Sequence, residues 1–265
     1  MRIHCQNATC RGARHHRRVE ACQDASASVV GEGWDGTTYG LLVIADGHGH
    51  PRHSRSAIGA QLACDLSVKL VKAHVEQPGG SSDLWPQWCQ QHFPTLLHQG
   101  WLQKITEHST AQGDNMALDP LAYGTTLGIV LITERWWLCA GLGDWDLVSI
   151  TGDLARIVNE ENSIAAPGES TFSLCLHNPL IAMAERFALH TINAQMDVRG
   201  LILSTDGIRK SCKNDQDFLE LSTYLFNLDP NTKALEDSLT RITKHGSEDD
   251  VSACIARLER WPTHN

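Results

Sequence analysis

Three apolar runs in the sequence each meet an aspartate at one end. These pairs are LLVIA with Asp46, LILST with Asp206, and VSACIAR with Asp249 and Asp250. A carboxylate buried alone at the end of an apolar strand is costly, so such groups are normally paired, hydrogen-bonded or bound to a metal ion. If the strand ends converge, a cation is their natural common partner. If they do not, each aspartate can simply cap a turn, as Asp-Gly does well.

The remaining pattern predicts sheets of mainly antiparallel strands. Strand-like runs rich in β-branched and aromatic residues lie at 37–45, 125–133, 135–142, 146–151, 186–192, 200–205 and 250–257. Helical patterns lie at 53–76, 83–110, 214–226 and 231–244. Strands follow one another directly within 125–151, whereas a doubly wound parallel sheet would alternate strand and helix. We therefore predict an α+β fold with helices packed outside antiparallel sheets.

The first helical stretch carries a regular apolar stripe. The stripe consists of Ile58, Leu62, Leu66 and Leu70. Side chains four residues apart lie on one face of a helix, so this face is predicted to contact the core.

Length and charge limit the classes of protein and partner. The 265 residues contain no internal repeat, which favours one domain over 1–265, and the net charge of −9 argues against nucleic acid as the main partner. No apolar run approaches the ~18 residues that span a bilayer, and the N-terminal residues lack the form of a secretory signal. Nine cysteines without a C-x-x-C pair indicate reduced thiols. We expect a cytoplasmic protein that does not bind membranes.

Two kinds of metal site compete within the stretch 46–53. His48, His50 and His53 have the H-x-H-x-x-H spacing of zinc hydrolases such as the metallo-β-lactamase fold, and imidazoles suit Zn²⁺. Arg52, however, occupies the position where those enzymes usually carry an acidic ligand, and its charge would repel the ion. His50 and His53 are therefore predicted to lie in a solvated loop or at a helix start.

The carboxylate before these histidines suggests a different ion. Asp46 and the carbonyl of Gly47 offer oxygen ligands at a strand end, which a hard ion such as Mg²⁺ or Mn²⁺ prefers. We predict that Asp46 holds metal.

Six short motifs, in order, resemble those of the metal-dependent type 2C (PPM) serine/threonine protein phosphatases. They are CQDA at 22–25, DGHG at 46–49, YGTTL at 123–127, LGD at 142–144, STDG at 204–207 and GSEDDVS at 246–252. The first has the form found in a bacterial branch, and the resemblance runs from about residue 10 to 258. It implies an αββα sandwich of two antiparallel sheets flanked by helix pairs, with two Mn²⁺ or Mg²⁺ ions at one end.

The resemblance also implies roles for individual residues. Asp46 would bridge both ions, and the carbonyl of Gly47 would complete one of them. Asp206 and Asp249 would bind the other ion, while Asp24 would hold waters of the Gly47 ion. A hydroxide bridging the two ions would attack the phosphoryl group, with no covalent phosphoenzyme.

Other positions have implied roles that are less direct. His48 resembles the family's general acid for the leaving seryl or threonyl oxygen. Asp250 stands where the family often has Asn and is expected to support the ligands. Gln23 replaces a glutamate that often precedes the first aspartate. The family's phosphate-binding arginine aligns with Val19.

Two further sites are left open by the sequence. Arg17 and Arg18, beside Val19, are candidates for binding phosphate. A third ion is possible, and the carboxylate that some members supply for it falls near Thr106, with Glu107 and Asp114 close by.

The implied function is hydrolysis of phosphoserine and phosphothreonine in a phosphorylated protein, opposing a serine/threonine kinase. Two alternatives have different predicted properties. A catalytically inactive relative would serve as a regulatory binding module, and a zinc hydrolase would prefer Zn²⁺ over Mn²⁺ or Mg²⁺.

Overall fold

Two antiparallel five-stranded sheets lie face to face in the computed structural model, which describes residues 1–113, 118–160, 171–176, 178–193 and 198–259. The first sheet has the order β1 (Arg2–Cys10), β10 (Val251–Glu259), β9 (Val198–Ser204), β6 (Asp146–Thr151), β7 (Leu154–Ile157). The second has the order β2 (Asp24–Glu32), β3 (Thr38–Asp46), β4 (Leu127–Ile132), β5 (Trp136–Leu142), β8 (Ala188–Thr191). The predicted antiparallel sheets are confirmed.

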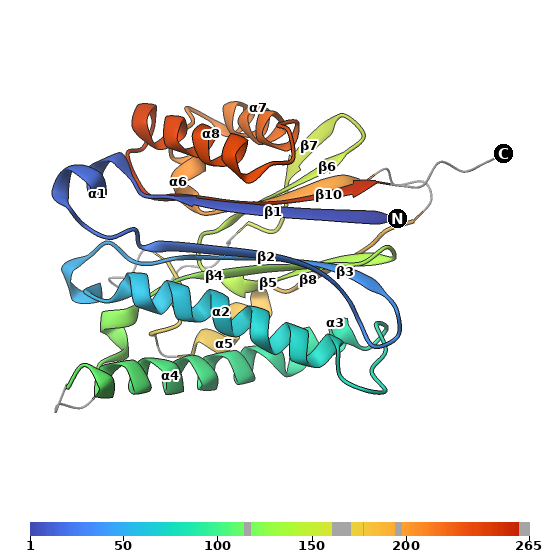
Figure 1. Cartoon of the computed structure of the whole chain (residues 1–265), viewed down its shortest axis with the longest axis horizontal. Coiled ribbons are helices and arrows are strands. Elements are labelled where there is room, and N and C mark those ends of the chain that lie inside the picture. Colours follow the sequence, from blue (N-terminus) through green and yellow to red (C-terminus); the bar gives the residue numbers. More distant parts are fainter. Residues whose placement is uncertain (114–117, 161–170, 177, 194–197, 260–265) are drawn as a thin grey trace.

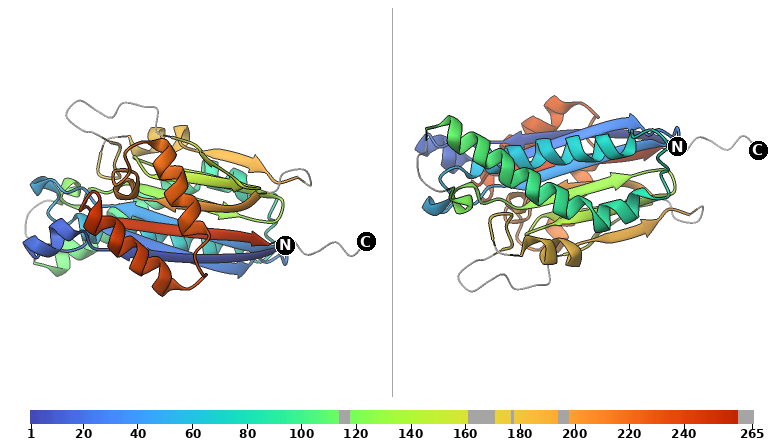
Figure 2. Two further views of the ribbon diagram at one scale, coloured as in Figure 1. Left: turned by 90° about the horizontal axis from the view of Figure 1, so that it is seen from above. Right: turned by 90° about the horizontal axis from the view of Figure 1, so that it is seen from below.

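Helices cover the outer face of each sheet (Figures 1 and 2). The second sheet is covered by α2 (Ser56–Val75), α3 (Trp85–Gln91), α4 (Phe93–Ala111) and α5 (Pro179–Glu185). The first is covered by α6 (Asp206–Arg209), α7 (Asp215–Phe226) and α8 (Thr232–His245). Three short elements lie in connections at one end of the sandwich: α1 (Ala13–Arg18), η1 (Pro51–His53) and η2 (Pro120–Tyr123). The four layers are the α+β sandwich that the sequence predicts.

Strand β3 is apolar on both faces because it is covered on both. Leu41 and Val43 belong to the cluster under the helices, whereas Leu42 and Ile44 belong to the cluster between the sheets, and all four are fully buried. Successive side chains of a strand point to opposite faces, which explains the continuous run LLVIA. The strand therefore delivers Asp46 to the end of the sandwich from a rigid position.

Strands β1 and β2 were not predicted, because polar side chains interrupt their apolar pattern. The Asn7 side chain donates to Ser26 Oγ at 3.0 Å, and Thr9 Oγ1 lies 2.7 Å from the same hydroxyl. These bonds join β1 of one sheet to β2 of the other. The polar residues are therefore half-buried in a hydrogen-bonded seam between two edge strands.

The helical prediction for 83–110 is wrong in one respect, because two helices form there. Helix α3 ends at Gln91, and α4 begins at Phe93 with Pro94 in its first turn. A proline disfavours helical geometry in the residue before it, so it starts a helix more readily than it continues one.

The predicted stripe on α2 is not the face in deepest contact with the core. Ile58 is 37% exposed, and the three leucines are only partly buried, whereas Ala60, Ala63 and Cys64 are fully buried. The small side chains of Ala60, Ala63 and Cys64 allow the helix to approach the sheet closely. The larger residues of the predicted stripe lie on the side of the helix, next to this contact face.

No helix in the described ranges is long and apolar enough to cross a membrane. The cytoplasmic location stays a prediction from the sequence.

Gly59 sets how closely α2 approaches η2. A Cβ at this position would collide with the backbone carbonyl of Tyr123, and the carbonyl of Gly59 accepts a hydrogen bond from Trp101 Nε1 at 3.0 Å. We expect Gly59→Ala to lower the free energy of unfolding by about 1–3 kcal/mol, as overpacking does. Denaturant unfolding measures this loss. Gly49→Ala is the control, because its Cβ would meet nothing closer than 3.6 Å; equal stability of the two variants would contradict the prediction.

Candidate metal centre

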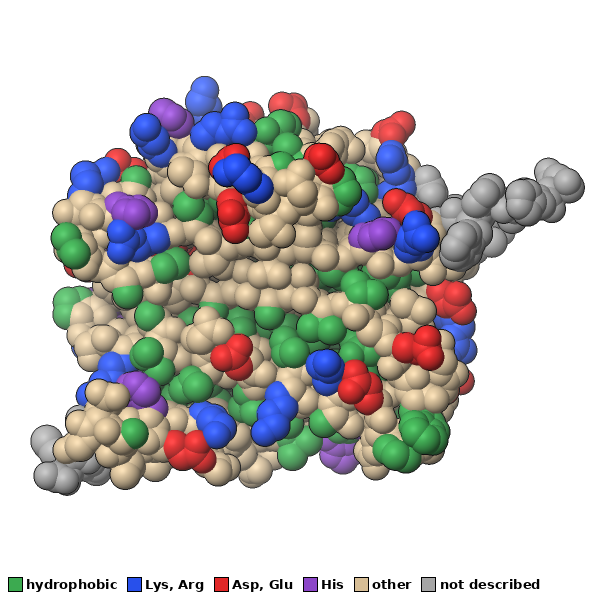
Figure 3. All heavy atoms as spheres, viewed as in Figure 1, with side chains coloured by type: hydrophobic (Ala, Val, Ile, Leu, Met, Phe, Trp, Pro, Cys, Tyr) green, Lys and Arg blue, Asp and Glu red, His purple; other side chains and the backbone are tan. Residues whose placement is uncertain are grey.

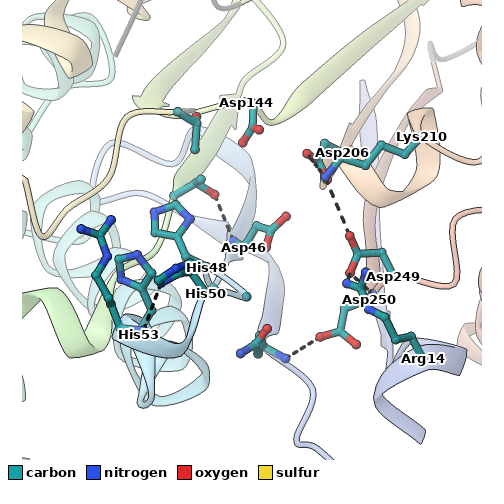
Figure 4. Close-up of a pocket in the computed structure, with 16 residues that line it drawn as sticks. Arg14, Asp46, His48, His50, His53, Asp144, Asp206, Lys210, Asp249 and Asp250 are labelled. Carbon is teal, nitrogen blue, oxygen red and sulfur yellow. Dashed lines mark hydrogen bonds and ion pairs between the residues drawn. The ribbon is translucent and has the colours of Figure 1, made fainter. Parts of the chain in front are cut away.

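The aspartates at the strand ends meet at one end of the sandwich. Asp24, at the start of β2, is the register partner of Asp46 at the end of β3. Asp206 follows β9, Asp249 precedes β10, and Asp144 lies between β5 and β6. A cavity of about 330 Å³ is lined by Asp46, Asp144, Asp206, Asp249 and Asp250 (Figure 4). The predicted convergence of three strand ends is therefore present in the structure.

The backbone of Asp46 is held by the two threonines of the YGTTL motif. Its N–H donates to Thr126 Oγ1 at 3.0 Å, and its carbonyl accepts from the Thr126 N–H at 2.9 Å and from Thr125 Oγ1 at 3.0 Å. Both threonines are buried. The motif thus fixes the strand end while the carboxylate of Asp46 faces the cavity (Figure 4).

Gly47 occupies a place with no room for a side chain. An added Cβ would lie 2.7 Å from the carbonyl oxygen of Gln23 and 2.9 Å from the backbone of Ser56. The Gly47 N–H donates to that same Gln23 carbonyl at 3.1 Å. Close approach of two chain segments, rather than a left-handed turn, requires glycine here.

Two cationic side chains reach the carboxylates. Lys210 Nζ lies 2.6 Å from Asp206 Oδ2 and 3.8 Å from Asp249 Oδ2. Arg14 Nη2 lies 2.7 Å from Asp249 Oδ1. The second oxygen of Asp206, Oδ1, is buried and has no hydrogen-bond partner in the described part of the chain. A buried carboxylate oxygen without a hydrogen-bond partner is a suitable ligand for a metal ion.

Burial and mutual repulsion raise the pKa values of these carboxyls. The pKa of Asp24 rises to about 8 because the group is buried and faces the charge of Asp250. The pKa of Asp206 rises to about 7 through burial and the charge of Asp144, although Lys210 opposes the shift. The pKa of Asp46 lies well above its ordinary value through burial and the charge of Asp24. A bound cation would favour the ionised form of all three.

The donor set fits a hard divalent ion, but the side chains are not yet gathered around one point. Across the described ranges, no three acidic, histidine or cysteine side chains stand close enough to hold one ion as they are. Lys210 and Arg14 hold Asp206 and Asp249 toward themselves. Ion binding therefore requires these carboxylates to exchange partners by side-chain rotation. Their oxygens suit Mg²⁺ or Mn²⁺ better than Zn²⁺.

The carboxylate of Asp250 is satisfied by protein groups, and its role in supporting the ligands stays a prediction. It is only 5% exposed, and its carboxylate accepts hydrogen bonds from the Gly12 N–H, from the Gln23 N–H at 2.6 Å and from His15 Nδ1 at 2.9 Å. One carboxylate thereby fixes both the start of α1 and the entry to β2. The backbone of Gln23 takes part, while its side chain lines the cavity.

The histidines separate into different roles. His48 lines the cavity, and its backbone N–H donates to the Gly124 carbonyl at 3.1 Å. His53 is buried at 3% exposure and donates from Nδ1 to the Leu121 carbonyl at 2.6 Å, so the prediction of a solvated loop is wrong for it. Its ring lies edge-on to that of His48, 4.8 Å between centroids, and fixes one side of it.

His50 lies at a helix start, as predicted, because its Nδ1 accepts from the Arg52 N–H at the beginning of η1. The bonds of His50 and His53 hold the loop together, which weakens the case for a zinc triad.

The candidate phosphate-binding arginines lie elsewhere. Arg17 makes a two-point ion pair with Glu248, at 2.9 and 2.6 Å, and does not line the cavity. Arg18 lines an adjoining groove instead. The arginine that does reach the cavity is Arg14, which sequence spacing missed because α1 turns it inward.

The residues predicted near a third ion do not lie at the cavity where the structure describes them. Thr106 and Glu107 are exposed on α4 and do not line the cavity, and Glu107 pairs with Lys104 at 2.6 Å. Asp114 lies outside the described residues. Asp144 lines the cavity instead, and the LGD motif was the signal that could have found it.

Comparison with known proteins decides the family. The family model for protein phosphatase 2C matches residues 11–242. The chain belongs to the protein phosphatase 2C family. It is therefore a serine/threonine phosphoprotein phosphatase by family, and metal dependence is characteristic of that family. No curated protein matches the sequence significantly.

Solved structures share the phosphatase 2C fold at low sequence identity. A bacterial serine phosphatase is 16% identical with a TM-score of 0.63, covering 99% of this chain and 100% of its own. Stp1 from Staphylococcus aureus is 17% identical with a TM-score of 0.62, covering 98% and 96%. The catalytic domain of PstP, solved with 2 manganese ions, is 14% identical with a TM-score of 0.60, covering 96% and 97%.

The raised carboxyl pKa values predict how the metal-free phosphatase responds to pH. Between its ordinary pKa of 3.8 and its folded value of about 8, Asp24 retains in the folded state a proton that the unfolded chain has lost. The free energy of unfolding should therefore fall as pH rises from 5 to 8 in EDTA. Asp24→Asn should reduce this fall. Denaturant unfolding at both pH values tests the prediction, and an unchanged dependence on pH in the variant would contradict it.

Lys210 should weaken metal binding, because its ammonium competes for Asp206. We expect Lys210→Met to tighten Mn²⁺ binding by about fivefold, since a partly exposed ion pair contributes up to about 1 kcal/mol. Isothermal titration calorimetry measures the dissociation constant directly. Lys213→Met, at a nearby exposed lysine, is the matched control. Weaker binding in Lys210→Met would show that the lysine supports the site.

Proposed function

We propose that this chain hydrolyses phosphoserine and phosphothreonine with two divalent ions, Mn²⁺ or Mg²⁺, held by Asp46, Asp206 and Asp249 and by the carbonyl of Gly47. The observation that carries the proposal is that these carboxylates line one cavity at the ends of separate strands, with Asp206 Oδ1 lacking a hydrogen-bond partner among the described residues. Asp24, buried beside Asp46, would hold an ion through water.

The cavity has the charge pattern that phosphate hydrolysis requires. Divalent ions, when bound, neutralise the phosphoryl charge and activate water as a nucleophile near neutral pH. The chain's own carboxylates would repel a phosphate dianion without them. Arg14 lines the same cavity, and release from Asp249 would free its guanidinium to orient phosphoryl oxygens by two parallel hydrogen bonds.

His48 is placed to act on the leaving group. His48 lines the cavity two residues beyond Asp46; its backbone is bonded to the Gly124 carbonyl, and its ring packs against the His53 ring. Protonation of the departing seryl or threonyl oxygen by His48 would avoid a poor alkoxide leaving group and contributes typically 10²- to 10⁴-fold. His53 is a positioning residue for this step.

Asp144 could support a third ion together with Asp206. The two side chains line the same cavity, and the charge of Asp144 raises the pKa of Asp206. The biological counterpart of the enzyme would be a serine/threonine kinase that phosphorylates the same proteins. The alternative of an inactive regulatory module would be favoured by loss of a ligand, and every proposed ligand is present.

The first test is phosphate release from a phosphothreonine peptide. We expect activity with Mn²⁺, none with EDTA, and a loss of roughly a hundredfold or more in Asp206→Asn, comparable with the removal of other single electrostatic groups from active sites. Asp217→Asn, exposed on α7, is the matched control and should behave as wild type. A folded protein inactive with every divalent ion would support the regulatory module, and activity with Zn²⁺ alone would support the zinc hydrolase.

A further inference from the structure

A second groove opens beside the carboxylate cavity. Its volume is about 750 Å³, within the range of ligand sites. Five residues line both spaces: Arg14, Gln23, Gly49, His50 and His53. The two spaces therefore adjoin, and a polypeptide whose phosphorylated residue lies in the cavity would have this groove beside it.

The groove carries positive charge on a chain of net charge −9. Arg14 and Arg18, four residues apart on α1, both line it, as residues on one helix face do. Basic (blue) and histidine (purple) side chains gather at the left end of the face in Figure 3, where Figure 1 places α1. Arg52 lines the neighbouring cavity and is exposed. The acidic side chain in the groove is Glu20, whose carboxylate lies 3.6 Å from His15 Nε2.

Arg18 differs from the other arginines near the site. Arg14 pairs with Asp249 and Arg17 with Glu248. The side chain of Arg18 is exposed and makes no hydrogen bond or ion pair within the ranges that the structure describes. Its guanidinium is thus available to an anionic group in the groove, where a planar fork of donors matches a carboxylate or a phosphate.

The helix that presents Arg18 is held in place. The Asp250 carboxylate accepts hydrogen bonds from the Gly12 N–H and His15 Nδ1, and the Arg14 N–H donates to the Glu248 carbonyl at 3.0 Å. A charge on a fixed element loses less conformational entropy on binding than one on a mobile loop. The backbone that carries Arg18 is therefore fixed before any partner arrives.

We propose that this groove binds the substrate polypeptide beside its phosphorylated residue and selects segments that carry acidic or additional phosphorylated residues there. The inference rests on the proposed function and specifies its substrate class. Arg18 is the specificity-determining residue. The ligand is an acidic peptide rather than nucleic acid, because the surrounding surface of a strongly acidic chain would repel a long polyanion.

The test compares two phosphothreonine peptides that differ only in flanking residues, glutamate in one and glutamine in the other. Wild type should show a higher kcat/KM for the acidic peptide, through a lower KM, and the preference should shrink as salt rises. Arg18→Gln should lower the acidic-to-neutral ratio by roughly two- to fivefold, the usual range for one exposed ion pair. Arg199→Gln removes an arginine at the far end of β9 and should leave the ratio unchanged.

A small aryl phosphate separates this inference from the proposed function. Metal-dependent hydrolysis of the aryl phosphate with no preference between the peptides would overturn the groove while leaving the phosphatase intact. An equal loss in Arg18→Gln on both peptides and the aryl phosphate would assign Arg18 to the reacting phosphate and also overturn it. A single-stranded oligonucleotide and an unphosphorylated acidic peptide can each be tested as inhibitors of peptide hydrolysis. Equally strong inhibition by the two would show a surface for polyanions in general and would overturn the assignment of the groove to acidic peptides. Absence of hydrolysis of every substrate would instead refute the proposed function.

Discussion

Electrostatic repulsion among buried carboxylates is the constraint on which the rest of this structure depends. Asp24 and Asp46 are register partners on β2 and β3, and the charge of Asp144 raises the pKa of Asp206. Such crowding destabilises a fold unless protons, basic side chains or metal ions compensate it. Lys210 and Arg14 supply part of this compensation. The two sheets, covered by helices, hold the strand ends rigidly enough for the repulsion to be maintained.

The predictable parts of the molecule are those with a strong local pattern. Strand β3 was recognised because both of its faces are buried, and its terminal Asp46 followed at once. Strands β1 and β2 were missed because their polar side chains are satisfied only by partners far away in the sequence, such as Asn7 and Ser26. The order of strands and helices predicts antiparallel sheets with helices outside them. It does not predict which face of each helix is most deeply buried.

The site divides in the same way. Asp46, Asp206 and Asp249 could be named because each adjoins an apolar run. Arg14 could not, because its direction depends on α1, and α1 is oriented by contacts with residues more than 200 positions later, among them Asp250. His53 was misjudged for a related reason, since its Nδ1 is bonded to the Leu121 carbonyl of η2, which lies far along the chain. Sequence identifies ligands attached to strands more readily than groups brought in by short connecting helices.

The pairing of β1 with β10 joins the two ends of the described chain, from Arg2 beside Glu259 to Cys10 beside Val251. Asp249 and Asp250 immediately precede that last strand, and Asp250 organises α1 at the other end of the sequence. Because a polypeptide is made from its N-terminus, β1 has no partner in its sheet until β10 has been synthesised. A chain that stops before Asp249 therefore lacks that carboxylate, the partner strand of β1 and the Asp250 contacts that orient α1.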